Sequence, residues 1–449
     1  MKEFNFEKLP IVEIANEIII DAVNKGASDI HFDPSKDSLK IRFRIDGILS
    51  DYSIVPSKYK RNMISRIKMI AGMNIMETRL PQDGAIKSKI GDRLLDLRVS
   101  TLPTNNAEKI VIRILDYSMS LAGLDNLGFS KDAMEKINKL IRIPNGIILV
   151  TGATGTGKST TLYSILQKLN TEEVNIITVE DPVEMDIAGI NQVQTQTEIG
   201  LTFATILRSI LRQDPNIIMI GEIRDDETAR IAVRASITGH LVLSTLHTNN
   251  SLNTIERLTD MDVERYLLGS SLEGIISQRL ARKLCPSCMI KRQTTEYEKQ
   301  VFKTVIGKDI NEMYVANKEG CPRCNHGYRG RLAILEVLIM NEKIKDAITN
   351  NAPKHVLRDL VYTGEVVTLL QDGLNKVVEG ETSFEEILKI VDLENDMTAY
   401  KDDNLVANLK MAQKAHSIKE TPQQPTPQVT QQVQQINNQI PNNVETVEF

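Results

Sequence analysis

The stretch from Gly152 to Thr160 constrains this chain more than any other, because it reads Gly-Ala-Thr-Gly-Thr-Gly-Lys-Ser-Thr. It fits the pattern G-x-x-x-x-G-K-[ST] at every fixed position. The apolar run Ile147–Val150 precedes it and a helical pattern begins near Thr161, so the motif has the strand and the helix that it needs. We interpret it as a phosphate-binding loop; the alternative is a glycine-rich turn without a ligand.

Each part of this loop has a predicted role in binding a nucleotide. Glycines let backbone N–H groups turn onto phosphate oxygens, and the following helix directs its positive end at the same anion. Lys158 would reach the β- and γ-phosphates, and the Ser159 hydroxyl would bind Mg²⁺. The predicted nucleotide-binding residues are Gly152, Ala153, Thr154, Gly155, Thr156, Gly157, Lys158, Ser159 and Thr160.

Length and composition predict a soluble protein of several folded units. A chain of 449 residues exceeds one hydrophobic core, and 41% hydrophobic with 25% charged residues is ordinary for a globular protein. A net charge of -5 argues weakly against nucleic-acid binding, although a local basic patch stays open. The N-terminus has no signal-peptide pattern and no run approaches a membrane-spanning helix. We therefore expect a cytoplasmic protein without direct nucleic-acid contacts.

The first domain is predicted to be α+β and to cover residues 1–116. Apolar residues recur at helical spacing over Ile11–Asn24, after which apolar and polar residues alternate as in half-buried strands. Asp46-Gly47 is a hairpin-turn signal. The remaining elements expected here are strands at Ser28–Asp33, Leu39–Gly47, Gly84–Ile90, Arg93–Ser100 and Lys109–Leu115, and a helix over Lys58–Gly72. Weak periodicity over residues 117–130 predicts a linker.

The second domain, residues 131–283, alternates short apolar strands with helices. Strands are expected at Ile147–Val150, Asn175–Val179, Ile217–Ile220 and Leu241–Thr245. This alternation predicts a mostly parallel, doubly wound α/β sheet whose chemistry lies at the carboxyl ends of the strands.

Three more strand ends carry chemically suggestive side chains. Glu180 follows one strand and Glu222 follows another, as a Walker B acid does. His247 follows the strand Leu241–Thr245. Acidic residues at strand ends are usually solvated caps, but their joint occurrence after one phosphate loop favours a shared nucleotide site.

These four stretches resemble the Walker A motif, aspartate box, Walker B motif and histidine box of the secretion ATPases that power type II secretion and type IV pilus assembly. The resemblance runs from about Ile11 to Val391 and implies an N-terminal domain followed by a RecA-like P-loop ATPase domain. It also implies that Arg98 and Arg113 approach the γ-phosphate as arginine fingers and that Glu180 activates or positions the attacking water.

The remaining roles follow from phosphoryl-transfer chemistry within that resemblance. Glu222 would hold Mg²⁺ through water, Ser159 would bind it directly, and His247 would sense the γ-phosphate. The alternative for Arg98 and Arg113 is ion pairing on a strand face. The sequence departs from the family pattern at Ala107, where glycine is usual, which leaves the approach of the arginines open.

All 4 cysteines lie in two C-x-x-C pairs, Cys285 with Cys288 and Cys321 with Cys324. Two such pairs supply the four thiolates of a tetrahedral zinc site, so residues 284–330 are predicted to form a zinc-binding element. A redox pair or free thiols is the alternative. The resemblance implies assembly or secretion rather than retraction, because retraction ATPases typically lack this element.

The last part of the chain changes character twice. Residues 331–396 show helical patterns and are predicted to form a small helical domain. Residues 397–449 are rich in Gln, Pro and Asn and are predicted to be disordered.

Together with these residues, the resemblance implies a homohexameric motor that hydrolyses ATP with Mg²⁺, holds Zn²⁺, and is recruited to the cytoplasmic membrane by a polytopic inner-membrane platform protein. Retraction and competence-pseudopilus motors are alternatives within this family, and a nucleic-acid translocase or a nucleotide-gated scaffold are alternatives outside it. Only about ten residues precede the first expected helix, where many relatives carry a further docking domain, so the docking route stays open.

Overall fold

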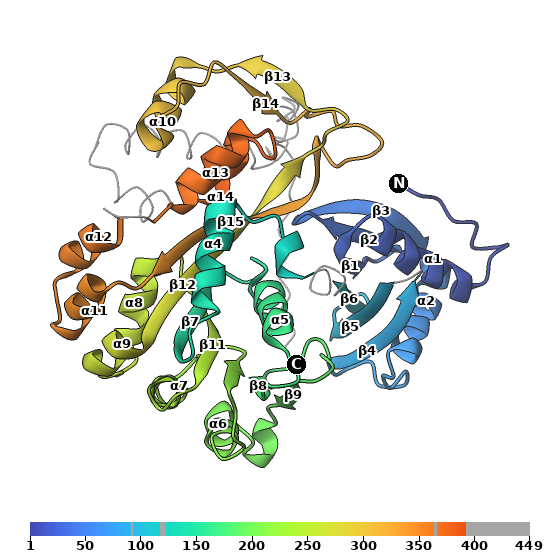
Figure 1. Cartoon of the computed structure of the whole chain (residues 1–449). Coiled ribbons are helices and arrows are strands. Elements are labelled where there is room, and N and C mark those ends of the chain that lie inside the picture. The colour runs from blue at the N-terminus through green and yellow to red at the C-terminus, as the bar shows by residue number, and fades with distance from the viewer. Residues whose placement is uncertain (91–92, 117–122, 363–365, 392–449) are drawn as a thin grey trace, which may run out of the picture.

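The computed structural model describes residues 1–90, 93–116, 123–362 and 366–391, which form two units built on separate sheets (Figure 1). The N-terminal unit ends at β6, and the second unit begins after the linker. The tail predicted over residues 397–449 and the first part of the linker, residues 117–122, lie outside the described residues.

The N-terminal unit consists of an antiparallel sheet and two helices, which share one apolar core. Its described strands follow the order β3-β2-β1-β6-β5-β4. In β1, Ile30 and Phe32 are buried while His31 between them is partly exposed, which is the alternation that the sequence predicts. The bounds are α1 (Ile11–Asn24), β1 (Ala27–Pro34), β2 (Ser38–Ile45), β3 (Ile48–Pro56), α2 (Ser57–Ile70), β4 (Gln82–Ile90), β5 (Arg93–Pro103) and β6 (Glu108–Asp116).

The hairpin between β2 and β3 forms where the sequence predicts it. Asp46 and Gly47 both have positive φ, 50° and 83°, which the twist of a two-residue hairpin loop requires. Glycine adopts such angles without a steric cost, and aspartate tolerates them better than most residues.

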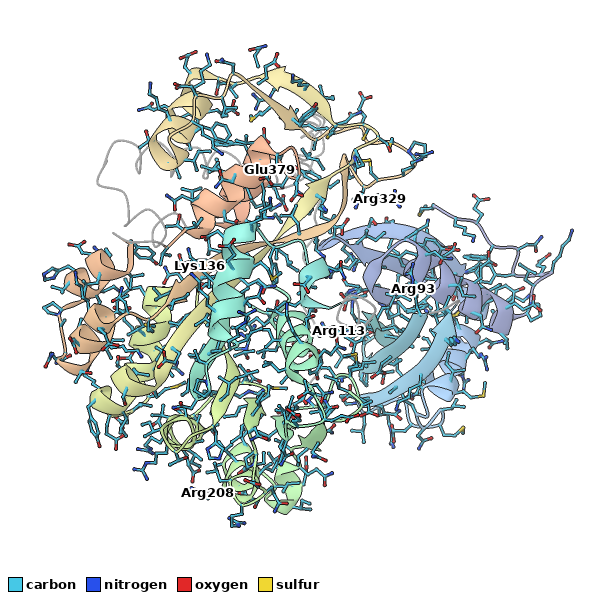
Figure 2. The ribbon with its side chains drawn as sticks, viewed as in Figure 1. Arg93, Arg113, Lys136, Arg208, Arg329 and Glu379 are labelled. Atoms are coloured by element: carbon cyan, nitrogen blue, oxygen red, sulfur yellow. The ribbon has the colours of Figure 1, made fainter. Side chains whose placement is uncertain are left out.

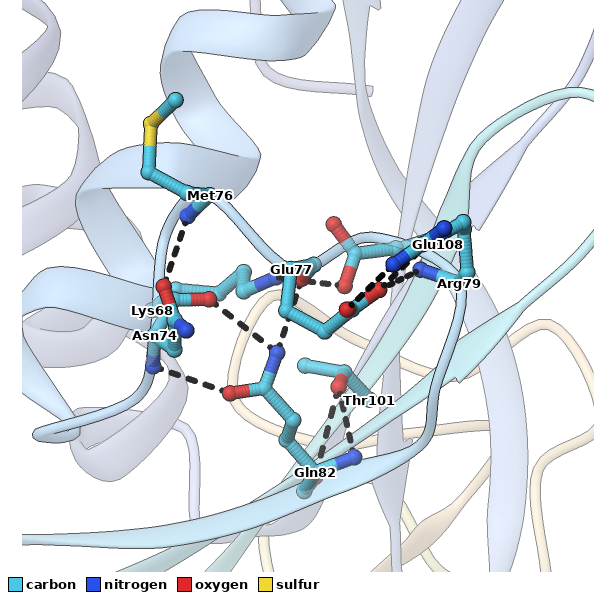
Figure 3. A network of polar contacts seen from close by, with 8 residues as sticks. All are labelled: Lys68, Asn74, Met76, Glu77, Arg79, Gln82, Thr101 and Glu108. Carbon is cyan, nitrogen blue, oxygen red and sulfur yellow. Dashed lines mark hydrogen bonds and ion pairs between the residues drawn. The ribbon is translucent and has the colours of Figure 1, made fainter.

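A buried ion pair ties α2 to β6 (Figure 3). The side chains of Lys68 and Glu108 are only 1% and 5% exposed, and Nζ of Lys68 lies 2.6 Å from Oε1 of Glu108. The same ammonium donates to the Glu77 carbonyl at 2.5 Å, and the Gln82 amide donates to that carbonyl at 2.9 Å. These bonds fix the loop between α2 and β4 against the sheet.

The second unit is a seven-stranded sheet in the order β15-β12-β7-β11-β10-β8-β9, within the described residues. Its strands are parallel except β15, which pairs antiparallel with β12 at the edge. The bounds are β7 (Gly146–Thr151), β8 (Ile176–Glu180), β9 (Asn191–Gln194), β10 (Ile217–Ile220), β11 (Leu241–Leu246), β12 (Leu272–Leu284) and β15 (Tyr328–Ile339).

Both faces of this sheet are covered by helices, so its central strands β7, β8, β10 and β11 are buried along their whole length. Ile147 and Leu149 of β7 pack into the core on one face, whereas Ile148 and Val150 pack into the core on the other. The helices are α4 (Lys131–Leu140) and α5 (Lys158–Leu169) on one face, and α6 (Phe203–Ile210), α7 (Asp226–Ile237), α8 (Ser251–Asp260), α9 (Arg265–Ser271), α11 (Glu342–Thr349) and α12 (Lys354–Tyr362) on the other.

A smaller layer stands beyond the β12–β15 edge (Figure 1). It contains a two-stranded sheet and three helices that share one apolar core with the far ends of β12 and β15. Its elements are β13 (Ile290–Gln293), α10 (Glu296–Ile306), β14 (Glu312–Val315), α13 (Leu369–Val378) and α14 (Phe384–Ile390).

The prediction of helical structure from residue 331 is wrong for its first part. Residues up to Ile339 continue β15, which pairs with β12 from Gly274 opposite Ile339 to Leu284 opposite Tyr328. Every residue from Leu332 to Leu338 is buried, so this strand has no alternation of apolar and polar residues to mark it. Helices follow only from Glu342.

We expect Glu108→Gln to destabilise the N-terminal unit by about 3–5 kcal/mol, because it leaves the buried Lys68 ammonium without a counter-charge. Hydrogen exchange of the β5 and β6 amides in the full chain measures this locally. The control is Asp51→Asn, which makes the same chemical change in an ion pair with Lys40 whose side chains are 43% and 45% exposed. Equal losses of protection in the two variants would contradict the expectation.

Candidate active site

The phosphate loop lies between β7 and α5, at the carboxyl edge of the sheet. Gly155 and Gly157 have φ of 80° and 88°, which turn backbone N–H groups toward one centre. A Cβ on Gly157 would lie 2.8 Å from Nε2 of Gln278, and one on Gly152 would lie 2.5 Å from the Gln278 carbonyl. Both positions therefore require glycine, because β12 passes directly beneath the loop.

Lys158 lies inside the loop that it would serve. Its Nζ donates to the carbonyls of Gly152 at 2.9 Å and Ala153 at 3.1 Å, and burial lowers its pKa from the ordinary lysine value. The charge of Glu222 opposes that shift, which places the Walker B acid near this ammonium. The loop therefore holds the Lys158 ammonium at the site where phosphate is predicted to bind.

Glu180 is buried, with 4% of its surface exposed, and is held by three donors. Its carboxylate accepts hydrogen bonds from the Tyr163 hydroxyl, from Oγ1 of Thr178 at 2.5 Å and from Nε2 of Gln192 at 3.0 Å. Burial raises the pKa of Tyr163, so this hydroxyl keeps its proton and remains a donor. The three donors fix the orientation of the carboxylate. Sequence reasoning missed them because each is an ordinary polar residue that no local motif marks.

A second carboxylate, Glu184, lies beside the phosphate loop. Its side chain bonds Ser159, and its backbone N–H donates to the Tyr163 hydroxyl at 3.2 Å. Burial raises the pKa of Glu184, while the positive charges of Arg98 and Arg113 oppose the shift. The sequence contained this residue within Glu180-Asp181-Pro182-Val183-Glu184, but its distance from the strand end gave no reason to single it out.

Glu222 and His247, predicted from separate strands, are in contact. Nε2 of His247 lies 3.1 Å from Oε2 of Glu222, and Arg224 pairs with the same carboxylate. Arg224 also lies 3.1 Å from Asp181, so it bridges the Walker B and aspartate-box loops. Sequence reasoning missed Arg224, although its place two residues after the Walker B acid was a usable signal.

The two arginines reach this site from the N-terminal unit. Arg98 donates to the Val183 carbonyl at 3.4 Å, and Arg113 lies 3.1 Å from Asp29 with 64% of its side chain exposed. Figure 2 shows Arg113 between the N-terminal sheet and α5. Both arginines also make the ion pairs of the alternative, since Nε of Arg98 lies 4.0 Å from Asp96 on the same strand, while the charges of both arginines act on Glu184.

The four cysteines gather into one cluster outside the sheet. Their sulfur atoms lie within 4.8 Å of one another, with Cys285 to Cys321 at 3.8 Å and Cys288 to Cys324 at 3.6 Å. The Cys321 N–H donates to the Cys324 sulfur at 3.2 Å, which draws the two ends of this C-x-x-C turn together. Four converging thiols with such a turn fit one tetrahedral metal ion.

Comparison with known proteins agrees with this arrangement. Residues 5–389 match the family described as type II/IV secretion system protein. The chain is 44% identical over 382 residues to the type II secretion system ATPase E of Vibrio cholerae, covering 85% of this chain and 75% of the relative. It is 45% identical over 381 residues to the type IV pilus assembly ATPase PilB of Myxococcus xanthus, covering 84% and 67%.

Solved structures show the same fold. The pilus retraction motor PilT with bound ADP aligns with a TM-score of 0.57 at 26% identity, covering 88% of this chain and 98% of that one. The ATPase DotB of Legionella pneumophila aligns with a TM-score of 0.63 at 21% identity, covering 86% and 97%.

Among the described residues, every helix is too short or too polar to cross a membrane. The family match encloses the phosphate loop, both acidic strand ends and the histidine loop, and the relatives at 44–45% identity are named as ATPases. The chain therefore belongs to the type II/IV secretion system protein family and is an ATPase of that family.

Proposed function

We propose that this chain is a homohexameric motor at the cytoplasmic face of the membrane, where ATP hydrolysis powers type IV pilus assembly or the related type II secretion pseudopilus. The observation that carries this proposal is that Arg98 of the first unit donates to the Val183 carbonyl, in the segment of the second unit that also holds Glu180 and Glu184. A site shared by two units couples nucleotide state to their relative position. In a ring, this coupling would displace a polytopic membrane platform protein.

The chain's own residues have defined roles in the hydrolysis that we propose. Lys158 and the loop N–H groups bind the phosphates, and Arg98 and Arg113 stabilise the charge that spreads over the γ-phosphate oxygens in the transition state. Ser159 and Glu222 would hold Mg²⁺, which neutralises charge on the β- and γ-phosphates. His247, through its contact with Glu222, would report whether the γ-phosphate is present.

Two carboxylates divide the work on the attacking water. Glu180, fixed by three donors, orients the water. Glu184 has a raised pKa caused by burial, and a carboxylate of raised pKa is the stronger base for the proton that the water loses. The contact of Glu184 with Ser159 supports this role, because it brings the carboxylate next to the predicted Mg²⁺ ligand.

Assembly or secretion is favoured over retraction by two observations. The relatives named for type II secretion and for pilus assembly are 44% and 45% identical, against 26% for the retraction motor. The second observation is the cluster of four cysteines, which we propose to hold Zn²⁺ and which the resemblance associates with assembly and secretion motors rather than retraction motors. A competence-pseudopilus role shares these features. The net charge of -5 disfavours a nucleic-acid translocase.

Deleting the gene in the source organism is expected to abolish surface pili or secretion, because no motor would then drive the platform protein. Counting pili, measuring secretion and measuring DNA uptake in the same strains separates the three roles. Complementation with the wild-type chain should restore the lost function, whereas Lys158→Ala should not. Loss of DNA uptake alone would favour the competence role, and no change in any assay would overturn the proposal.

Replacing Glu180 by Gln is expected to lower kcat for ATP hydrolysis by about 10²-fold, the cost of misplacing a reacting group, while ADP still binds. Steady-state phosphate release and ADP titration measure the two effects. Glu184→Gln, assayed in parallel, tests the division of roles between the carboxylates. The control is Glu173→Gln, on an exposed residue before β8. Turnover that survives both Glu180→Gln and Glu184→Gln would contradict the assignment.

We expect Arg98→Ala and Arg113→Ala each to lower kcat by about 10³–10⁵-fold, because each removes a guanidinium that stabilises transition-state charge. ATP affinity should change much less, since the fingers act mainly in the transition state. Arg142→Ala, at an exposed position of the second unit, is the matched control. If the two arginine variants hydrolyse ATP as fast as the control, the arginine-finger role is contradicted and only the ion-pair role remains.

A further inference from the structure

A cavity of about 850 Å³ adjoins the phosphate loop where the two units meet the cysteine element. Gly157 and Thr160 of the loop form part of its wall, and Leu127 and Phe129 from the segment before α4 form another. Residues 322–325 of the cysteine element close a third side. This volume suits a small organic ligand.

The cavity lies on the nucleoside side of the loop. A phosphate loop cradles the α- and β-phosphates on its backbone, while its lysine reaches toward the γ-phosphate. Glu180, Glu184 and Glu222, which belong to the γ-phosphate side, are absent from the described lining. The sugar and base of a nucleotide bound at Lys158 therefore leave the loop toward this cavity.

The lining has the chemistry that a nucleoside needs. Leu127, Phe129 and Leu280 offer apolar surface for the face of a base. Positive charge surrounds them, since Asp46 is the one acid among the described lining residues and already accepts a hydrogen bond from the Gly330 N–H at 3.1 Å. The cations are Lys25, Arg93, Arg323, Arg329 and Arg331. Figure 2 shows Arg93 and Arg329 on facing parts of the two units.

The shape of one wall depends on the cysteine cluster. Cys324 itself belongs to the lining, and Arg323 precedes it in the same turn. That turn is closed by the bond from the Cys324 N–H to the Cys321 carbonyl at 3.1 Å and faces the partner turn through Cys288, 3.6 Å from Cys324. A metal ion that bridges the two turns would hold this wall of the cavity in place, and loss of the ion would release the wall.

We propose that the cysteine element forms part of the binding surface for the nucleoside of the bound nucleotide, so that zinc at the four cysteines raises nucleotide affinity. The proposal rests on the proposed function, because it assumes that the phosphates occupy the loop at Lys158. Arg323 and Arg329 are the specificity-determining residues, since a planar guanidinium stacks on a base and donates to its acceptors. The ligand class is a nucleoside di- or triphosphate.

Calorimetric titration of the full-length chain tests this with two ligands, MgADP and Mg-tripolyphosphate. Tripolyphosphate fills the phosphate loop but has no sugar or base. Zinc removal by a chelator under reducing conditions should weaken ADP binding by about tenfold, the value of one good charged contact, and leave tripolyphosphate binding unchanged. Arg323→Ala and Arg329→Ala should have the same selective effect in zinc-loaded protein, without disturbing the cysteines.

Lys318→Ala is the control, because Lys318 is an exposed cation of the same element outside the cavity lining. Elemental analysis must first find zinc on the purified chain; its absence would overturn the proposal. Unchanged ADP affinity in the stripped protein and both arginine variants, or an equal loss for both ligands, would also overturn it. Failure of the wild-type chain to bind either ligand would instead overturn the proposed function.

Discussion

The phosphate loop keeps its shape because one buried side chain, Gln278, bonds both the middle of the loop and the helix that follows it. Nε2 of Gln278 donates to the Thr156 carbonyl at 2.8 Å, and Oε1 accepts from the Thr161 hydroxyl at 2.8 Å. Gln278 lies on β12, which pairs with β7 on one side and β15 on the other. An amide with only 3% of its surface exposed has no water to exchange with, so these bonds hold the loop open for phosphate.

The paired strands β12 and β15 therefore support the phosphate loop and the cysteine element as well as the sheet. The middle of β12 positions Gln278 beneath the loop. The end of β12 at Leu284 and the start of β15 at Tyr328 carry the cysteine element and pack against the C-terminal helices. Ser277, next to Gln278, lies 3.0 Å from Thr151 at the end of β7. A displacement of the cysteine element along this pair would thus reach the residues that shape the nucleotide site, since packed strands move as rigid elements.

The other half of the site depends on charge that crosses between the units. The N-terminal unit contributes Arg98 and Arg113, and the second unit contributes Glu184, whose pKa burial raises against the pull of both arginines. Only the docked arrangement brings these charges together. In the hydrolysis that we propose, these arginines supply the cations at the γ-phosphate, so the proposed site is complete only while the units are closed.

Local sequence determined the parts of this protein whose patterns are short. The phosphate loop, the Asp46-Gly47 hairpin, the alternating strands of the first sheet and the paired cysteines each follow from spacing within a few residues. Backbone conformation and side-chain alternation are local properties, so they can be predicted without knowing the fold.

The tertiary structure alone decided which distant residues meet. β12 and β15 were missed because both are buried on two faces and show no alternation. The donors to Glu180, the contact of Glu184 with Ser159 and the support of Gln278 join segments that are up to about 120 residues apart, and no local pattern marks them. The sequence by itself determined that a nucleotide is bound and hydrolysed; packing decided which carboxylates, cations and walls surround it, because only packing brings remote side chains within bonding distance.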